Sequence, residues 1–71
     1  MKIIETNVNR YSGNDCMISK DVSLVEVNNN YVVIESTSYS GYFGYDENIN
    51  IHKDNYSLEE ARKIYNDLLK E

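Results

Sequence analysis

The clearest pattern of apolar and polar positions lies near the C-terminal end of the chain. Apolar side chains recur there at steps of three and four residues, which is the period of one face of an α-helix. These positions are Leu58, Ala61, Ile64, Tyr65, Leu68 and Leu69. Ser57 and Glu60 form a capping box in front of them, and Tyr56 stands where a hydrophobic staple begins. The pattern predicts a helix of about 13 residues that starts after Ser57.

Two stretches in the middle of the chain are rich in β-branched residues and predict a β-hairpin. They span residues 22–27 and 31–37, and the asparagine run 28–30 separates them. Asparagine tolerates positive φ angles, so this run suits a tight turn.

The turn sets the register of this hairpin and therefore the face that each side chain occupies. With the last two asparagines as a two-residue loop, Val27 pairs with Val32 and Val25 pairs with Ile34. These four aliphatic side chains then share one face, which we expect the helix to cover. The other face is mixed and carries Leu24, Glu26, Val33 and Glu35.

Two further segments complete the expected sheet. Residues 45–53 alternate, with Glu47, Ile49 and Ile51 on one side and Asp46, Asn48, Asn50 and His52 on the other. Residues 2–8 predict another strand, 9–15 are rich in turn-forming residues, and 16–19 have no clear pattern. The order is β-β-β-β-α in a single α+β domain spanning residues 1–71. We expect a small antiparallel sheet of three to four strands, covered on one face by a C-terminal helix.

Charge narrows the classes of partner that the chain can bind. The formal net charge is −5, with 7 Lys and Arg against 12 Asp and Glu. Binding to DNA, RNA or an anionic membrane depends on basic side chains, so direct binding to them is disfavoured. Segment 35–60 has six acidic residues and one lysine, and this segment would attract a protein with a basic surface.

The residues that carry most catalytic and metal chemistry are scarce. Cys16 is the only cysteine and His52 the only histidine, so neither a disulfide within the chain nor a Cys/His zinc site can be assembled. Asp46 and Glu47 lack the spacing of a calcium loop, and no glycine-rich phosphate loop is present. We therefore expect no enzyme activity, no metal and no cofactor.

Hydropathy and cysteine usage indicate the compartment. No stretch approaches the roughly 18 apolar residues that span a bilayer, and the first residues do not have the pattern of a signal peptide. One unpaired cysteine is compatible with a reducing environment. We expect a cytoplasmic protein that does not associate with membranes.

The segment 38–47 is the strongest candidate for a binding surface. Four aromatic residues fall within seven positions, separated by serine and glycine and followed by two acids. Tyrosine supplies contact area at low entropic cost, and serine and glycine supply an adaptable backbone. The alternative is a wide turn whose rings fold back onto a small core. The candidate partner-binding residues are Tyr39, Tyr42, Phe43, Tyr45, Asp46, Glu47, Asp54, Glu59 and Glu60.

In size, acidity, lack of catalytic motifs and α+β build, the chain resembles small inhibitor proteins that phages and mobile elements encode, anti-CRISPR proteins among them. The resemblance carries no residue-level motif, so no functional residue is transferred. It implies a non-enzymatic inhibitor whose acidic, tyrosine-rich surface blocks a nucleic-acid-binding protein, as a nucleic-acid mimic would. Two alternatives stay open: a small-ligand or nucleotide-binding module acting as a sponge, and a structural subunit that assembles into a homo-oligomer.

Overall fold

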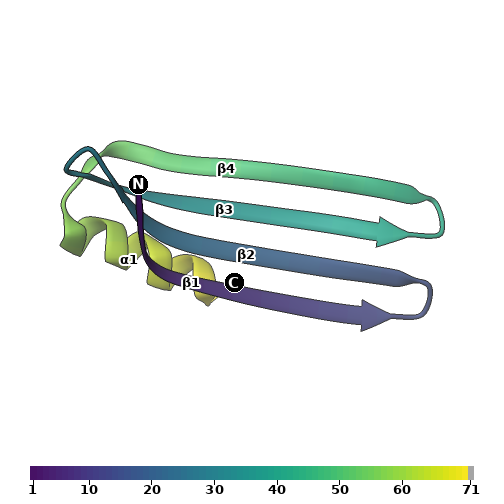
Figure 1. Ribbon diagram of the computed structural model, residues 1–71. Coiled ribbons are helices and arrows are strands. Elements are labelled where there is room, and N and C mark those ends of the chain that lie inside the picture. The colour runs from purple at the N-terminus through teal and green to yellow at the C-terminus, as the bar shows by residue number, and fades with distance from the viewer. Residues whose placement is uncertain (71) are drawn as a thin grey trace.

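The computed structural model describes residues 1–70, except for the side chain of Asn55, and consists of one sheet and one helix. The elements are β1 (Lys2–Gly13), β2 (Cys16–Val27), β3 (Asn30–Gly41), β4 (Gly44–Tyr56) and α1 (Leu58–Leu69). The strands form an antiparallel meander in the order β1-β2-β3-β4, and α1 lies against one face of it (Figure 1). The α+β prediction and the predicted element order are therefore confirmed.

The first two strands are longer than the sequence pattern predicted. β1 continues to Gly13 and β2 starts at Cys16, so only two residues of the turn-rich segment form the turn. Asp15 has a φ of 63°, which an acidic residue in a tight turn tolerates. The remaining residues of 9–13 are extended because each pairs with β2, in an unbroken register from Glu5↔Leu24 to Gly13↔Cys16.

The central hairpin turns one residue earlier than we expected. Asn28 and Asn29 have φ angles of 50° and 66°, and this pair of positive values is typical of a two-residue type I′ loop. Val25 consequently pairs with Val32, and the predicted pairing of Val25 with Ile34 is wrong. Val25, Val27, Val32 and Ile34 still share one face, as predicted. The pairing differs from the predicted one by two residues, and side chains alternate with a period of two.

The helix covers the opposite face from the one we expected. The core cluster under α1 contains Val22, Leu24 and Val33 from the sheet with Ala61 and Tyr65 from the helix. Leu24 and Val33 are fully buried, although their face is the mixed one.

The charges on the covered face do not block the helix because they pair with each other and with the helix end. Lys20 Nζ donates a 2.9 Å hydrogen bond to the carbonyl oxygen of Leu68 and lies 3.6 Å from the carboxylate of Glu35. Carbonyls of the last turn lack partners within the helix, so this lysine on β2 supplies one. The charged residues of the mixed face thereby help to seat the helix.

At the other end of α1, Ser57 caps the helix. Its hydroxyl oxygen accepts a 3.2 Å hydrogen bond from the backbone N–H of Glu60, as predicted. The hydroxyl also donates to the Glu60 carboxylate at 3.1 Å. Arg62 joins the helix to β1 through a 3.0 Å contact with Glu5.

The strands extend far beyond the helix. A 12-residue strand is roughly 40 Å long, whereas a 12-residue helix is roughly 18 Å long. The molecule measures 42 × 20 × 17 Å, and α1 underlies only the end that carries the 28–29 turn (Figure 1). We call the half of the sheet that α1 covers the proximal half, and the half that ends in turns 14–15 and 42–43 the distal half.

Candidate protein-binding surface

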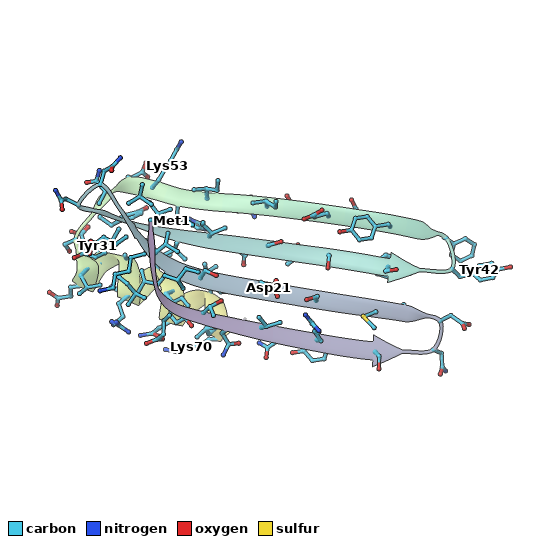
Figure 2. The ribbon with its side chains drawn as sticks, viewed as in Figure 1. Met1, Asp21, Tyr31, Tyr42, Lys53 and Lys70 are labelled. Atoms are coloured by element: carbon cyan, nitrogen blue, oxygen red, sulfur yellow. The ribbon has the colours of Figure 1, made fainter. Side chains whose placement is uncertain are left out.

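Two aromatic side chains stand at the end of the β3–β4 hairpin. Gly41 pairs with Gly44, which leaves Tyr42 and Phe43 as the turn. Gly44 has a φ of +133°, a conformation that a residue with a Cβ rarely adopts. Tyr42 is 83% exposed and Phe43 is 94% exposed, and Figure 2 shows Tyr42 projecting past the end of the strands. Their rings meet edge to face, with centroids 5.4 Å apart.

Behind this turn, a row of large side chains crosses the helix-bearing face beyond the helix. Tyr11 pairs with Ile18 and Ile18 pairs with Tyr39, so the three are neighbours on one face. Each has more than a third of its surface exposed. We call the five residues Tyr11, Ile18, Tyr39, Tyr42 and Phe43 the distal aromatic surface.

Gly41 allows the ring of Tyr39 to lie along the sheet toward the turn. A Cβ built at Gly41 would lie 2.7 Å from Cζ of Tyr39, so any larger residue there would have to displace the ring. The glycine therefore permits this orientation of Tyr39, which connects the row of large side chains to the turn.

The two distal turns are attached to each other. The backbone N–H of Tyr42 donates a 3.2 Å hydrogen bond to the carbonyl oxygen of Asp15. A hollow lies between the turns, lined by Asn14, Asp15, Cys16, Tyr39, Tyr42 and Phe43. The aromatic turn therefore has a defined position relative to the neighbouring hairpin.

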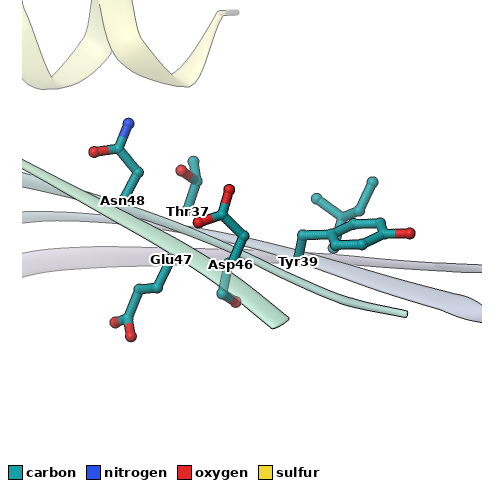
Figure 3. A pocket seen from close by; sticks show the side chains of 7 residues that line it. Thr37, Tyr39, Asp46, Glu47 and Asn48 are labelled. Atoms are coloured by element: carbon teal, nitrogen blue, oxygen red, sulfur yellow. The ribbon is translucent and has the colours of Figure 1, made fainter. Parts of the chain in front are cut away.

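A second hollow lies on the same face between the helix and the turn. Its lining includes Ile18, Thr37, Tyr39, Asp46 and Asn48, and Figure 3 shows Asp46 and Asn48 on the helix side of the sheet. Glu47 points to the other side. The lining contains no lysine or arginine, so a phosphate placed here would meet the Asp46 carboxylate without a compensating cation.

Two of the candidate residues lie on the opposite face of the distal half. Tyr45 and Glu47 alternate with Asp46, and the Tyr45 hydroxyl donates a 3.1 Å hydrogen bond to the Glu47 carboxylate. That hydrogen bond is the largest cause of a raised pKa for Tyr45, followed by desolvation and the charge of Glu47. The structure therefore separates Tyr45 and Glu47 from the distal aromatic surface.

Three of the acidic candidates lie at the far end of the molecule. Asp54 is eight residues along β4 from Asp46, a separation of roughly 25 Å in an extended strand. Glu59 and Glu60 are in the first turn of α1, where negative charge is favourable beside the helix N-terminus. The predicted residues thus form three groups, because Asp54, Glu59 and Glu60 lie apart from the aromatic residues and from the pair on the opposite face.

Tyr11 and Ile18 were absent from the residues that the sequence indicated. Both lie in segments without a strand pattern: asparagine, arginine, serine and glycine surround Tyr11, and methionine and serine flank Ile18. The signal that could have found them is the glycine, asparagine and aspartate at 13–15, which marks a second tight turn. A hairpin built on that turn places Tyr11 opposite Ile18.

Comparison of the chain with protein-family models, with curated proteins and with solved structures finds no match. Within residues 1–70, no helix has the length and apolar character needed to cross a membrane. In the same part of the chain, no three His, Cys, Asp or Glu side chains are grouped so that they could hold a metal ion.

Proposed function

We propose that this chain is a non-enzymatic protein-binding domain that contacts its partner through the distal aromatic surface. The observation that carries the proposal is the exposure of Tyr42 and Phe43 in a turn that needs no aromatic residue for its backbone geometry. Exposed aromatic side chains lose solvent-accessible apolar surface on binding and dominate the energetics of many interfaces. The attachment of the turn to Asp15 reduces the entropy that binding would have to remove.

The charge beside this surface indicates the chemistry of the partner. Asp15 lies at the neighbouring turn, and Asp46 lies at the start of β4 on the same face as Tyr39. A basic protein surface, such as that of a nucleic-acid-binding protein, complements these carboxylates. In this proposal the domain acts in the cytoplasm as an inhibitor that occupies the basic surface.

Affinity capture with matched variants tests the proposal. The bait is the tagged protein, compared with the double variant Tyr42→Ser and Phe43→Ser and with a control, Glu59→Gln, at the other end of the molecule. We expect one protein partner to be retained by the wild type and by the control, and lost with the double variant. Its association rate should fall as salt is raised, because charged side chains steer the encounter.

Two results would contradict the proposal. One is a partner that binds the double variant as well as it binds the wild type. The other is a partner lost with Glu59→Gln and retained by the double variant, which would move the binding surface to the acidic group at the proximal end.

A further inference from the structure

The face of the sheet that α1 does not cover is the more aliphatic one. The register and the alternation of side chains place seven aliphatic residues there. They are Ile3, Val8, Val25, Val32, Ile34, Ile49 and Ile51. We call this set the open aliphatic face. Val25 confirms the assignment, because it is buried yet does not belong to the core cluster under the helix.

Six of these side chains are neighbours across the four strands, whereas Val8 is separated from them by Asp21 and Ser36 in its row. Ile3, Val25 and Val32 are cross-strand neighbours in one row. Ile34 pairs with Ile51 in the next row, and Ile49 follows one row further on. Ile3, Ile49 and Ile51 are each more than half exposed. Val25 is buried and Val32 and Ile34 are half-buried, so the patch presents apolar surface to water mainly at these three isoleucines.

We propose that a second copy of this chain covers the open aliphatic face, so that the two sheets pack face to face in a two-fold dimer. The dimer would have four layers, with the helices outside and the aliphatic faces of the two sheets in contact at the centre. Sheets pack in this way about 10 Å apart, with side chains of the two inner faces interdigitating. A two-fold axis brings the same patch from both copies together, so the surface needs only to be self-complementary.

The exposed area of the chain agrees with a missing partner of this size. The protein exposes 5335 Å², whereas a folded monomer of 8.3 kDa exposes about 4600 Å² by the usual scaling of surface with mass. The surplus of roughly 700 Å² is close to the ~800 Å² that each partner buries in a standard protein interface. One further copy of the chain would bring the exposed area per molecule to the ordinary range.

The charge distribution favours an identical copy over a basic partner on this face. The chain has a net charge of −5, yet a single acid, Asp21, lies within the rows of the open aliphatic face, and Lys53 follows Ile51 at their edge on β4. Asp21 accepts a hydrogen bond from Ser19 on its own strand. An apolar patch with a single acid gives a basic protein little to recognise, and homodimer interfaces are the more apolar class.

The small size of the core gives a reason for dimer formation. Among the described residues, six hydrophobic side chains are buried: Val22, Leu24, Val25, Val33, Ala61 and Tyr65. Chains of this length have little stability from one core and commonly gain it by association. The dimer would provide a second core on the other side of the same sheet.

Sedimentation equilibrium of the purified protein at about 1 to 200 μM tests this inference. We expect the wild type to be a dimer. The double variant Ile49→Lys and Ile51→Lys should be a folded monomer, because both side chains are more than half exposed in the single chain and lysine can reach water from them. The double variant removes four isoleucines from the interface of a dimer, two from each copy. Its dimer dissociation constant should therefore be more than roughly 100-fold higher than that of the wild type.

Controls separate this interface from the other surfaces. Ile18→Lys replaces an exposed isoleucine of the helix-bearing face and should leave the dimer intact. The variant Tyr42→Ser and Phe43→Ser should also remain a dimer, because the proposed partner-binding surface is distinct from this face. If the lysine variant does not fold by circular dichroism, Ile49→Thr with Ile51→Thr keeps the β-branched shape and should still weaken the dimer at least about 10-fold.

A wild type that is monomeric at 200 μM would overturn the inference and would leave a heterologous partner as the occupant of this face. A dimer that persists in both double variants would also overturn it. In that case the contact would lie elsewhere, with the exposed edges of β1 and β4 as the next surfaces to test.

Discussion

The proximal and distal halves of the sheet are built from the same four strands, yet they have different surroundings. On the helix-bearing face of the proximal half, Leu24 and Val33 have no exposed surface. On the same face of the distal half, Ile18 and Tyr39 are 42% and 38% exposed. The difference is the helix, which is less than half as long as the strands.

This comparison separates the source of stability from the surface available for binding. The proximal half holds the core cluster, the helix caps and the Lys20 contact with the helix end. The distal half is held by backbone ladders and by the bond between its two turns. Regions with few buried apolar contacts open more readily, so the distal half should exchange its amide hydrogens faster than the proximal half.

The largest expected effect comes from removing a core side chain of the proximal half. Leu24→Ala deletes a fully buried side chain under the helix and leaves a cavity among Val22, Val33 and Tyr65. The free energy of unfolding should fall by about 2 to 5 kcal/mol. Urea denaturation followed by circular dichroism measures it, at one fixed protein concentration.

The matched variant in the distal half is Ile18→Ala, on the same strand and the same face. Because Ile18 is already 42% exposed, its loss should lower the free energy of unfolding by less than about 1 kcal/mol. Equal losses in the two variants would mean that something covers the distal half as tightly as α1 covers the proximal half.

The contact of the sheet with the helix end should have the next largest effect. Lys20→Met keeps much of the side-chain volume but removes the hydrogen bond to Leu68 and leaves the carboxylate of Glu35 without its nearby cation. The free energy of unfolding should fall by about 1 to 2 kcal/mol. Lys53→Met, on the exposed part of β4, is the control and should change it by less than about 0.5 kcal/mol. If the two variants were equally stable, the Lys20 contacts would contribute nothing to holding the helix.

A smaller effect concerns Tyr65 and the decline of stability at high pH. Burial raises the pKa of Tyr65, and the charge of Glu5 and its hydrogen bond with the hydroxyl act in the same direction. The unfolded chain therefore loses this proton at a lower pH than the folded one. The contribution of Tyr65 is complete below pH 10 and declines as the pH rises from there through the folded-state pKa.

Tyr65→Phe removes that contribution, so the stability of the variant should fall less steeply above pH 10 than that of the wild type. At pH 7 the variant should be less stable by about 1 kcal/mol, because it lacks the hydroxyl group. Denaturation curves between pH 7 and 11 measure both quantities. Tyr42→Phe, at an 83% exposed position, is the control and should keep the wild-type slope. An unchanged slope in Tyr65→Phe would show that this hydroxyl does not account for alkaline sensitivity.

The structure of the proximal half was predicted from the sequence better than that of the distal half. The exception is the face of the sheet that the helix covers. The period of the helix stripe and the Ser57 cap identified α1, because both signals are local. The covered face was predicted wrongly, because valine and isoleucine at 25, 32 and 34 outnumber the apolar residues at 24 and 33. The contacts that hold the helix on this face include the one between Lys20 and Leu68, which are 48 residues apart, and no local pattern contains it.

The distal half was predicted less completely, because its structure also depends on contacts between residues far apart in the sequence. The aromatic turn was evident from composition, since four rings and two glycines lie together in segment 38–47. The row that connects Tyr39 to Tyr11 depends on pairing between three strands, and two of them are polar there. Residues 9–13 adopt a strand through their partners on β2 rather than through their own propensity.

The smallest expected effect on stability is at the aromatic turn. This prediction tests most directly whether the distal half serves binding rather than stability. Tyr42→Ser with Phe43→Ser removes two side chains that are 83% and 94% exposed. Serine is itself a common turn residue, so the backbone of the turn should be unaffected. The free energy of unfolding should change by less than about 0.5 kcal/mol, because almost no buried surface is lost. If these rings serve binding, the same variant should lose its protein partner while it keeps wild-type stability. A loss of more than about 1 kcal/mol would instead show that the rings fold back onto the sheet in solution and contribute to the fold.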